Sequence, residues 1–199
     1  MTIPAAAAPG LRERKKERTR QTIQDQAVRL FLNQGYEQTT VEQIAAAADV
    51  SERTFFRYFP AKADILALDV IEPVVMEAFV GQDRGLAATA ALRSAIREVY
   101  AALPPDRLER ERERQRLVAQ VAGLHAITPG KLESVLDLLA GALAARMGRP
   151  SSDPAVATWA GAVAGVVGAC YRDWAREGAG RDFIDMADGR LSVLEGGLP

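Results

Sequence analysis

Apolar residues recur at helical spacing along most of the chain, and almost no segment alternates as a strand does. Over residues 11–34, Ala27, Leu30 and Phe31 follow Ile23 by four, seven and eight residues, which places all four on one helix face. Gly35 comes next and predicts a left-handed C-terminal cap. Residues 1–10 hold small side chains and two prolines, so we expect a disordered arm there.

Two short helices are predicted after this long one. Ser51 is a favourable N-cap for the second of them, Asp49 and Val50 form the turn before it, and Pro60 ends it at Phe59. Two short helices joined by a turn behind a longer helix predict a helix-turn-helix. The first short helix begins at a capping box, for which two residue pairs qualify: Thr39 with Glu42, or Thr40 with Gln43.

The rest of the chain continues as helices separated by glycine and proline. The predicted fold is all-α with about nine helices. We expect an arm over 1–10, a helix-turn-helix domain over 11–62, and a larger helical domain over 63–199. The helices predicted in this larger domain lie near 62–80, 86–103, 106–123, 130–147, 154–177 and 182–195.

Composition excludes several classes of function. The chain has 199 residues, 48% of them apolar and 26% charged, which is typical of a globular protein. The single cysteine and single histidine exclude a disulfide framework and zinc sites built from cysteine and histidine pairs. No nucleophile–base pair, paired carboxylates or phosphate-binding glycine loop indicates an enzyme or a cofactor. No secretory signal precedes the first helix, so we expect a cytoplasmic protein.

Charge is segregated along the chain. Residues 1–62 carry 10 basic and 7 acidic side chains, whereas the whole chain has 25 and 26, so the remainder is net acidic. A basic N-terminal segment indicates a polyanionic partner, although a charge run alone also fits a solvated helix face. The basic residues that we expect to follow a DNA backbone or enter the minor groove include Arg12, Lys15 and Lys16.

The third predicted helix has the chemistry of a recognition helix. Phe55 and Phe59 are four residues apart and point inward, so Arg53, Thr54 and Arg57 lie on the opposite face. Arginine can hydrogen-bond guanine O6 and N7 together, and an aromatic edge can pack on a thymine methyl group. The residues suited to phosphate contacts, which fix register without reading sequence, are Tyr58, Thr40 and Lys62.

These residues resemble the DNA-binding domain of the tetracycline-repressor (TetR) family over residues 12–66. The resemblance implies that Glu52, Arg53 and Phe56 face base edges, with Ser51 and Arg57 also in the candidate DNA-binding set. It implies that Thr40, Thr54, Tyr58 and Lys62 face phosphates. The motifs that carry it are Gly35-Tyr36, Thr39-Thr40-Val41, Ile44-Ala45, Val50-Ser51, Thr54-Phe55-Phe56, Tyr58-Phe59-Pro60 and Lys62.

The chain departs from the family pattern at two positions. Asp49 replaces the glycine common before the Val-Ser pair, which is tolerable because aspartate enters turn conformations readily. Arg53 replaces a usually small residue, and we interpret it as a determinant of sequence specificity. Glu52 has two open roles: it accepts from cytosine N4, or it favours the helix N-terminus electrostatically.

Two features of the larger domain have more than one interpretation. The run 107–116 pairs Glu109 with Arg112 and Glu113 with Arg116, which favours a solvated helix face over a nucleic-acid patch. Residues 155–171 carry no charge, yet their alanines and glycines favour a dimer interface and core over a membrane span. Family resemblance implies that the last two long helices pair across a two-fold axis.

The expected ligand pocket lies inside this helical domain, although its residues are equally suited to plain core. His125 is either a capping histidine or a polar pocket group, and a redox role for Cys170 requires an exposed thiol with a lowered pKa. The stretch 113–126 resembles C-terminal domains described as binding acyl-CoA-like ligands. The candidate pocket residues are Phe79, Tyr100, Val121, His125, Trp159, Val163, Val167 and Cys170.

Together these features predict a dimeric repressor released from an inverted-repeat operator by a small-molecule ligand that is apolar or acyl-CoA-like. The expected partners are double-stranded operator DNA, this effector and a second copy of the chain, with no membrane and no metal. Two alternatives stay open. The first is an all-α enzyme or binding protein, in which the exposed basic face of the third helix would have no function. The second is an architectural DNA binder, which would bind DNA without sequence preference.

Overall fold

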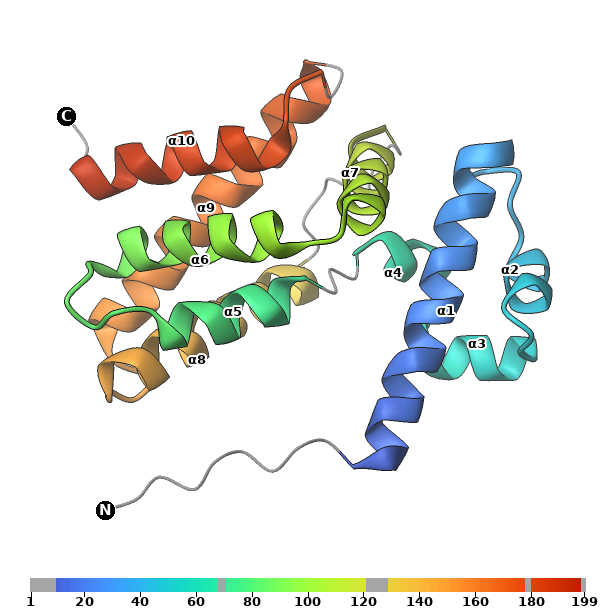
Figure 1. The fold of residues 1–199 in the computed structure, drawn as a ribbon, viewed down its shortest axis with the longest axis horizontal. Helices are drawn as coiled ribbons and strands as arrows, with labels where there is room; N and C mark the ends of the chain where they lie inside the picture. Colours follow the sequence, from blue (N-terminus) through green and yellow to red (C-terminus); the bar gives the residue numbers. More distant parts are fainter. Residues whose placement is uncertain (1–9, 68–70, 121–128, 178–179, 198–199) are drawn as a thin grey trace. The chain divides into compact units, whose positions relative to one another are not determined.

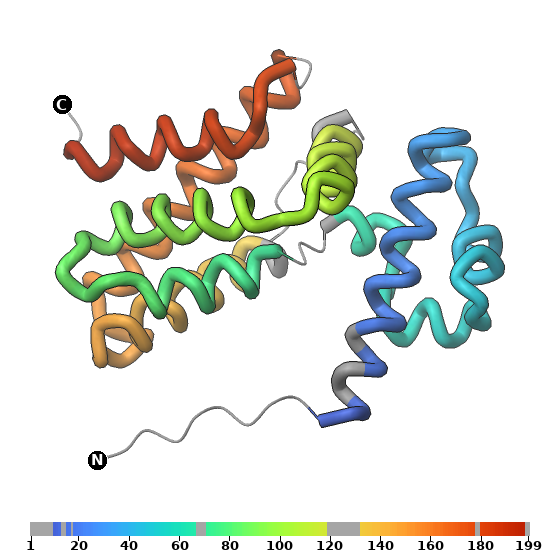
Figure 2. Tube along the Cα trace, viewed as in Figure 1, coloured from blue at the N-terminus to red at the C-terminus, as the bar shows by residue number. Residues whose placement is uncertain are grey.

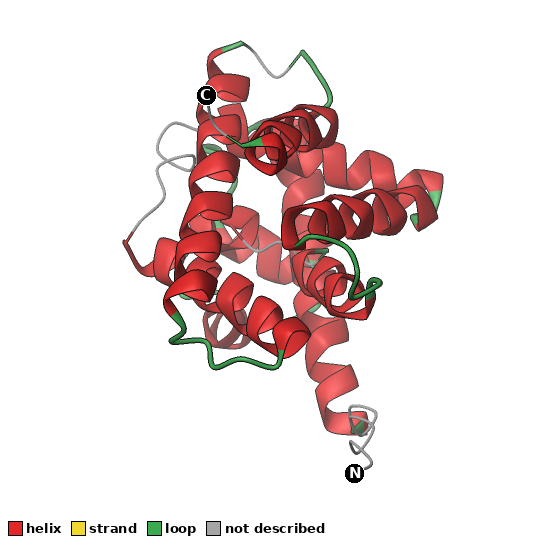
Figure 3. Ribbon diagram, turned by 90° about the vertical axis from the view of Figure 1, so that its left-hand side faces the viewer, coloured by secondary structure: helices red, strands yellow, loops and turns green. Residues whose placement is uncertain are grey.

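The computed structural model describes residues 10–67, 71–120, 129–177 and 180–197, which form ten helices and contain no strand (Figure 3). The all-α prediction is confirmed. The chain divides into two compact units, Met1–Leu68 and Asp69–Pro199. The arm predicted over 1–10 lies almost entirely outside the described residues.

The first unit holds four helices: α1 (Leu11–Gln34), α2 (Val41–Ala47), α3 (Glu52–Tyr58) and α4 (Lys62–Ala67), with α2 and α3 packed beside α1 (Figure 1). The predicted inner face of α1 is confirmed at Ile23, Ala27 and Phe31, which are buried. Leu30, at the edge of that face, is half-buried. Gly35 has φ +90° and its N–H donates to the carbonyl of Phe31 at 2.9 Å, as a C-terminal cap requires.

The α4 helix packs into the first unit although it follows the helix-turn-helix. Its Ile65 and Leu66 are fully buried, and the side-chain amide of Gln24 on α1 donates to the Ile65 carbonyl at 2.8 Å. This buried hydrogen bond ties the end of the unit to its longest helix.

The second unit holds the remaining helices. Their order is α5 (Glu72–Gly81), α6 (Ala88–Ala102), α7 (Pro105–Gln120), α8 (Pro129–Met147), α9 (Pro154–Arg176) and α10 (Phe183–Gly196). In Figure 2 the chain runs along α5 and returns along α6, whereas the next helix, α7, lies at a steep angle to them.

The single helix predicted for residues 62–80 is wrong, because the structure has α4 and α5 there. Pro73 lies in the first turn of α5, where its missing N–H costs nothing and its fixed φ favours a new helix start. A proline at the same place inside a continuous helix would have removed a backbone hydrogen bond. This break accounts for ten helices where about nine were expected.

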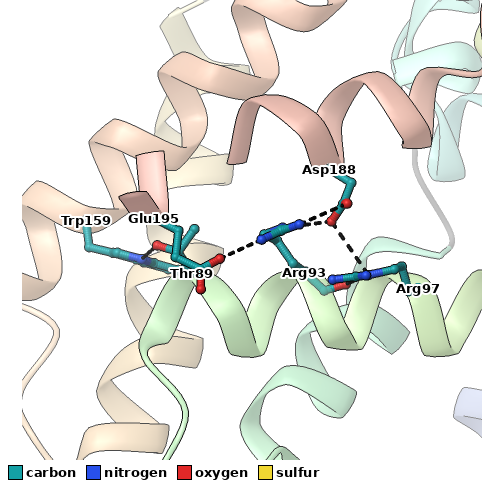
Figure 4. A network of polar contacts seen from close by, with 6 residues as sticks. All are labelled: Thr89, Arg93, Arg97, Trp159, Asp188 and Glu195. Atoms are coloured by element: carbon teal, nitrogen blue, oxygen red, sulfur yellow. Dashed lines mark hydrogen bonds and ion pairs between the residues drawn. The ribbon is translucent and has the colours of Figure 1, made fainter. Parts of the chain in front are cut away.

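The core of the second unit is apolar and draws on α5, α6, α8, α9 and α10. Phe79 of α5 is fully buried and stacks on Trp159 of α9, with ring centroids 5.4 Å apart and planes 8° apart. The Trp159 indole N–H donates to the Thr89 hydroxyl at 3.1 Å, so α6 joins the same contact (Figure 4).

An ion-pair network joins α6 to α10. Arg93 donates from Nε to Asp188 at 2.8 Å and from Nη1 to Glu195 at 2.6 Å, while Arg97 lies 3.6 Å from Asp188 (Figure 4). The hydrogen bond from Arg93 holds the pKa of Asp188 below its usual value, and the carboxylates raise the pKa of Arg93. These partly exposed contacts fix α10 along α6.

Within the described residues, α9 is the one helix long and apolar enough, by length and composition, to cross a membrane. In this structure it is a core helix on one side, burying Val156, Val163 and Trp174 in the unit. Its exposed side carries Thr158, Gly161 and other small residues. A helix of this kind has one face available for close helix packing.

Candidate DNA-binding interface and effector region

The N-terminus of α2 is fixed by the capping box at Thr40 and Gln43. The Thr40 hydroxyl accepts from the Gln43 N–H at 3.2 Å, and the Thr40 N–H donates to the Gln43 side-chain oxygen at 3.0 Å. Of the two predicted pairs, this one forms. Thr39 is buried instead, and its hydroxyl donates to the Gly35 carbonyl at 2.7 Å. Thr40 is therefore exposed with a fixed hydroxyl that still has its proton to donate.

The turn between α2 and α3 depends on Asp49, which adopts φ +54°. Aspartate is one of the few side chains that enter this left-handed region, so the residue replaces the family's glycine without a change of turn. Ser51 then caps α3, because its hydroxyl accepts from the Thr54 N–H at 3.2 Å. It also donates to the Thr54 hydroxyl at 3.0 Å, which orients both side chains.

The two faces of α3 separate as the sequence predicts. Phe55 and Phe59 are buried with ring centroids 5.8 Å apart. Phe56 packs edge-on against Phe55, yet its side chain remains 48% exposed. The remaining exposed side chains on α3 are Glu52, Arg53 and Arg57.

The end of α3 and the start of α4 bear the other candidate phosphate contacts. Tyr58 is half-buried, and the Arg57 guanidinium lies 5.3 Å from the centre of its ring. Lys62 has a second role that the sequence did not indicate: its amine donates to the carbonyls of Tyr36 at 2.8 Å and Thr39 at 3.0 Å. These bonds tie the loop before α2 to α4 and leave one Lys62 N–H for a phosphate.

The Lys62 amine also packs against the aromatic ring of Tyr36. The Lys62 amine lies 4.2 Å from the centre of the Tyr36 ring, which itself packs 5.0 Å from the Phe31 ring. Burial, with smaller effects of Glu37 and Asp64, raises the pKa of Tyr36, so the ring stays neutral. The basic residues at the start of α1, namely Arg12, Lys15 and Lys16, are all exposed.

The candidate pocket residues fall into two neighbouring clusters of the second unit. Phe79 and Val163 are buried in the main core, and Tyr100, Trp159 and Val167 are half-buried against it. Cys170 belongs to a second cluster, around Trp174 and Phe183. Val121 and His125 lie outside the described residues.

A redox role for Cys170 finds no support in its surroundings. The side chain is fully buried, and burial raises the pKa of its thiol, although the nearby Arg190 acts in the opposite direction. A raised pKa keeps sulfur protonated and unreactive. Core packing, the other interpretation, agrees with this environment.

The solvated face predicted over residues 107–116 is present at Glu109, Arg110 and Arg116, which are exposed, but it does not account for the whole run. Glu111, Arg114 and Gln115 are all buried, and the Arg114 guanidinium donates to the Glu111 carboxylate at 2.6 Å. Gln115 donates to the same carboxylate at 3.0 Å and to the Tyr100 hydroxyl at 3.2 Å. Buried charges persist only when paired in this way. The charge run therefore conceals a buried polar cluster, Glu111, Arg114, Gln115 and Tyr100.

The two ion pairs predicted on α7 give way to others. Arg112 pairs with Asp182 of the α9–α10 connection at 2.9 Å, and Arg116 pairs with Glu109 at 3.4 Å. A partner from another element was available to Arg112, and spacing along one helix cannot reveal such a partner.

Comparison with known proteins decides the family. Residues 86–199 match the model of the MftR C-terminal domain, and residues 23–68 match the model of bacterial regulatory proteins of the tetR family. The first match covers more than half of the chain. The chain belongs to the TetR family of transcriptional regulators. Members of this family bind DNA and are not enzymes, so the enzyme alternative is rejected.

The regulator is 37% identical over 147 residues to the HTH-type transcriptional regulator TcmR of Streptomyces glaucescens. That alignment covers 70% of this chain and 65% of TcmR, so it spans slightly less than two thirds of the relative's length.

Two solved structures share its fold. Thermus thermophilus FadR, a TetR-family repressor in complex with lauroyl-CoA, has 25% identity and a TM-score of 0.56, covering 90% of this chain and 95% of that one. SmeT, the repressor of the Stenotrophomonas maltophilia efflux pump SmeDEF, has 20% identity and a TM-score of 0.55, covering 89% and 88%.

Proposed function

We propose that this regulator is a cytoplasmic, dimeric repressor that binds an inverted-repeat operator through α3 and leaves it when a small molecule binds its second unit. The observation that carries the proposal is the division of α3 into two faces. Phe55 and Phe59 anchor the helix in the core, while Glu52, Arg53 and much of Phe56 are exposed. A short, firmly anchored helix with an exposed arginine suits the major groove.

Each proposed contact has a chemical basis. Arg53 donates to guanine, Phe56 packs on a thymine methyl group, and Glu52 accepts from cytosine N4 or favours the helix N-terminus. The proposed phosphate donors, which set the register of α3, are the Thr54 and Thr40 hydroxyls, Tyr58, Arg57, the remaining N–H of Lys62, and Arg12, Lys15 and Lys16. Ser51 contributes by orienting the Thr54 hydroxyl, to which it donates at 3.0 Å.

A dimer follows from the exposed side of α9. Thr158, Gly161 and Gly165 lie on its exposed side, and small residues permit close helix contact. We propose that α9 and α10 pair with their copies across a two-fold axis. Two recognition helices related in this way require an inverted repeat. Selection from a random duplex library tests this directly: a palindromic consensus is expected, and a single unrepeated half-site contradicts the dimer.

The proposed effector has an apolar chain and a polar end. Phe79, Trp159, Val163 and Val167 supply apolar surface, and Tyr100 connects it through Gln115 to the buried polar cluster of α7. The FadR relative of similar fold binds lauroyl-CoA, which has both parts. Val121, His125 and Cys170 complete the proposed pocket set. An effector acts only through different affinities for the DNA-binding and released states.

Lauroyl-CoA is the first probe for release. The regulator is bound to the selected duplex, and the fluorescence anisotropy of the labelled DNA is followed as lauroyl-CoA is added, with free coenzyme A as control. We expect release by lauroyl-CoA and none by coenzyme A. Equal behaviour of the two rejects lauroyl-CoA as the effector. The same assay with triclosan, with which the relative SmeT forms a complex, tests an apolar effector.

A further inference from the structure

The DNA-binding unit contains an arginine, Arg20, whose guanidinium forms no hydrogen bond or ion pair with the residues that the structure describes. Arg20 lies on α1 in a row with Arg12 and Lys16, because residues four apart fall on the same side of a helix. Arg12 and Lys16 are exposed at the start of the helix, whereas Arg20 is half-buried one turn further on. The row therefore leads from the exposed end of α1 into the body of the unit.

Arg20 is held where α1 meets the end of α3. The centre of its guanidinium lies 5.9 Å from the ring centre of Phe59, the buried residue that directly follows α3. A guanidinium laid on an aromatic face loses little freedom when it later binds an anion, because the plane is already oriented.

The same guanidinium lacks hydrogen-bond partners. Its Nε is buried and bonded to nothing, and among the side chains that the structure describes Arg20 forms no ion pair. Leaving a buried donor unpaired is unfavourable, so such groups in native proteins call for an explanation. Because Nε is buried, the two Nη groups are the donors that remain for a ligand.

We propose that Arg20 binds a phosphate of the DNA backbone beside the C-terminal end of α3, with its Nη donors as the fork and Phe59 as the support. The inference rests on the proposed function and adds a residue to it. A phosphate supplies paired oxygens that match the arginine fork, and contacts from α1 and α3 to the same strand fix the helix in the groove. The residue positions α3 and does not read bases.

The test compares two arginines of α1 that differ in their side of the helix. Arg29 is exposed and nine residues from Arg20, half a turn out of phase, so Arg20→Gln and Arg29→Gln remove equal charge from opposite sides. Affinity for the library-selected duplex and for a shuffled duplex is measured by anisotropy over a salt series.

We expect Arg20→Gln to weaken binding to both duplexes about tenfold and to reduce the salt slope by about one, as loss of one phosphate contact does. Arg29→Gln should stay within about twofold of wild type. Arg20→Lys keeps the charge, so it should restore the slope but only part of the affinity, because a lysine lacks the planar fork. Thermal unfolding of each variant shows whether the fold is intact.

Three results overturn the inference. Equal slopes for Arg20→Gln and Arg29→Gln, with wild type binding normally, reject the phosphate contact and leave the proposed function intact. A lower melting temperature for Arg20→Gln with an unchanged salt slope assigns Arg20 to folding alone. Failure of the wild type to bind either duplex rejects the proposed function itself, and the inference with it.

Discussion

Replacing Arg146 with methionine should strongly destabilise the second unit. The side chain comes from the last turn of α8 and is 5% exposed, yet its partners are carbonyls and not carboxylates. Its guanidinium donates to Gln82 at 2.6 Å, to Leu86 at 3.1 Å and to Asp83, all in the α5–α6 connection. It also lies 5.6 Å from the centre of the Phe79 ring.

The size of the effect follows from these contacts. Hydrogen bonds to a charged group contribute about 1.5–3 kcal/mol each, and the carbonyls left behind are partly re-solvated by water. Counting the bonds to Gln82 and Leu86 alone gives a loss of about 3–5 kcal/mol in the free energy of unfolding. For a urea m-value of about 2 kcal/mol/M, the unfolding midpoint falls by about 2 M.

Tryptophan fluorescence during urea unfolding measures this loss, since both tryptophans, Trp159 and Trp174, belong to the second unit. Arg149→Met is the matched control: Arg149 lies three residues away, is 51% exposed and pairs with Asp153 at 3.3 Å. An exposed pair of this kind contributes about 0–1 kcal/mol. Equal unfolding midpoints for the two variants would refute this stabilising role of Arg146.

Three further outcomes are expected. No atom lies within 4 Å of a Cβ placed at Gly165, so Gly165→Leu should fold but should sediment as a monomer. The control Gly141→Leu, on the exposed side of α8, should remain a dimer. A dimeric Gly165→Leu variant would reject the α9 interface. At positive φ glycine is unstrained, aspartate is slightly strained and alanine is strained more. Asp49→Gly should therefore raise the free energy of unfolding of the first unit by about 0.5–1 kcal/mol, and Asp49→Ala should lower it. Circular dichroism during thermal unfolding measures both changes, and the opposite order contradicts a left-handed turn at Asp49. Because the pKa of Asp188 is lowered in the folded state, its carboxylate stabilises the fold above about pH 4 and loses this effect as the pH falls. The free energy of unfolding should therefore fall more steeply with decreasing pH for wild type than for Asp188→Asn. Parallel curves would argue against a stabilising ion pair between Arg93 and Asp188.

Local rules predicted the DNA-binding unit well. The capping box at Thr40, the cap at Ser51 and the inward pair Phe55 and Phe59 depend on residues three or four apart, and the structure has all of them. Even the left-handed turn at Asp49 followed from the residue type. Within one helix or one turn, sequence neighbours are also spatial neighbours, so spacing carries the information.

Residue spacing along a helix did not predict the long-range contacts. Arg146 meets carbonyls more than 60 residues earlier in the chain, and Lys62 donates to carbonyls of the loop before α2. The charge run on α7 looked solvated, yet tertiary packing buries Glu111 and Arg114. Each case involves a long cationic side chain or a charge whose partner lies on another element, and periodicity along one helix cannot identify that partner.

The pocket residues illustrate a second limit. Phe79, Val163 and Cys170 are fully buried, as residues of an ordinary core also are. Helical spacing marks the inside of a bundle but does not separate a wall that opens for a ligand from one that stays closed. These assignments therefore stay predictions that effector binding tests.

The central claim is sequence-specific DNA binding through α3, and fluorescence anisotropy tests it most directly. The wild-type regulator is titrated against labelled DNA from its own upstream region, with shuffled competitor and a salt series, beside Arg53→Ala and Tyr58→Phe. We predict specific, strongly salt-dependent binding by wild type. Arg53→Ala should lose about 1–3 kcal/mol and its discrimination at one base position, and Tyr58→Phe should weaken all sequences equally. Equal affinity of the wild type for specific and shuffled DNA, with Arg53→Ala unchanged, would contradict the account.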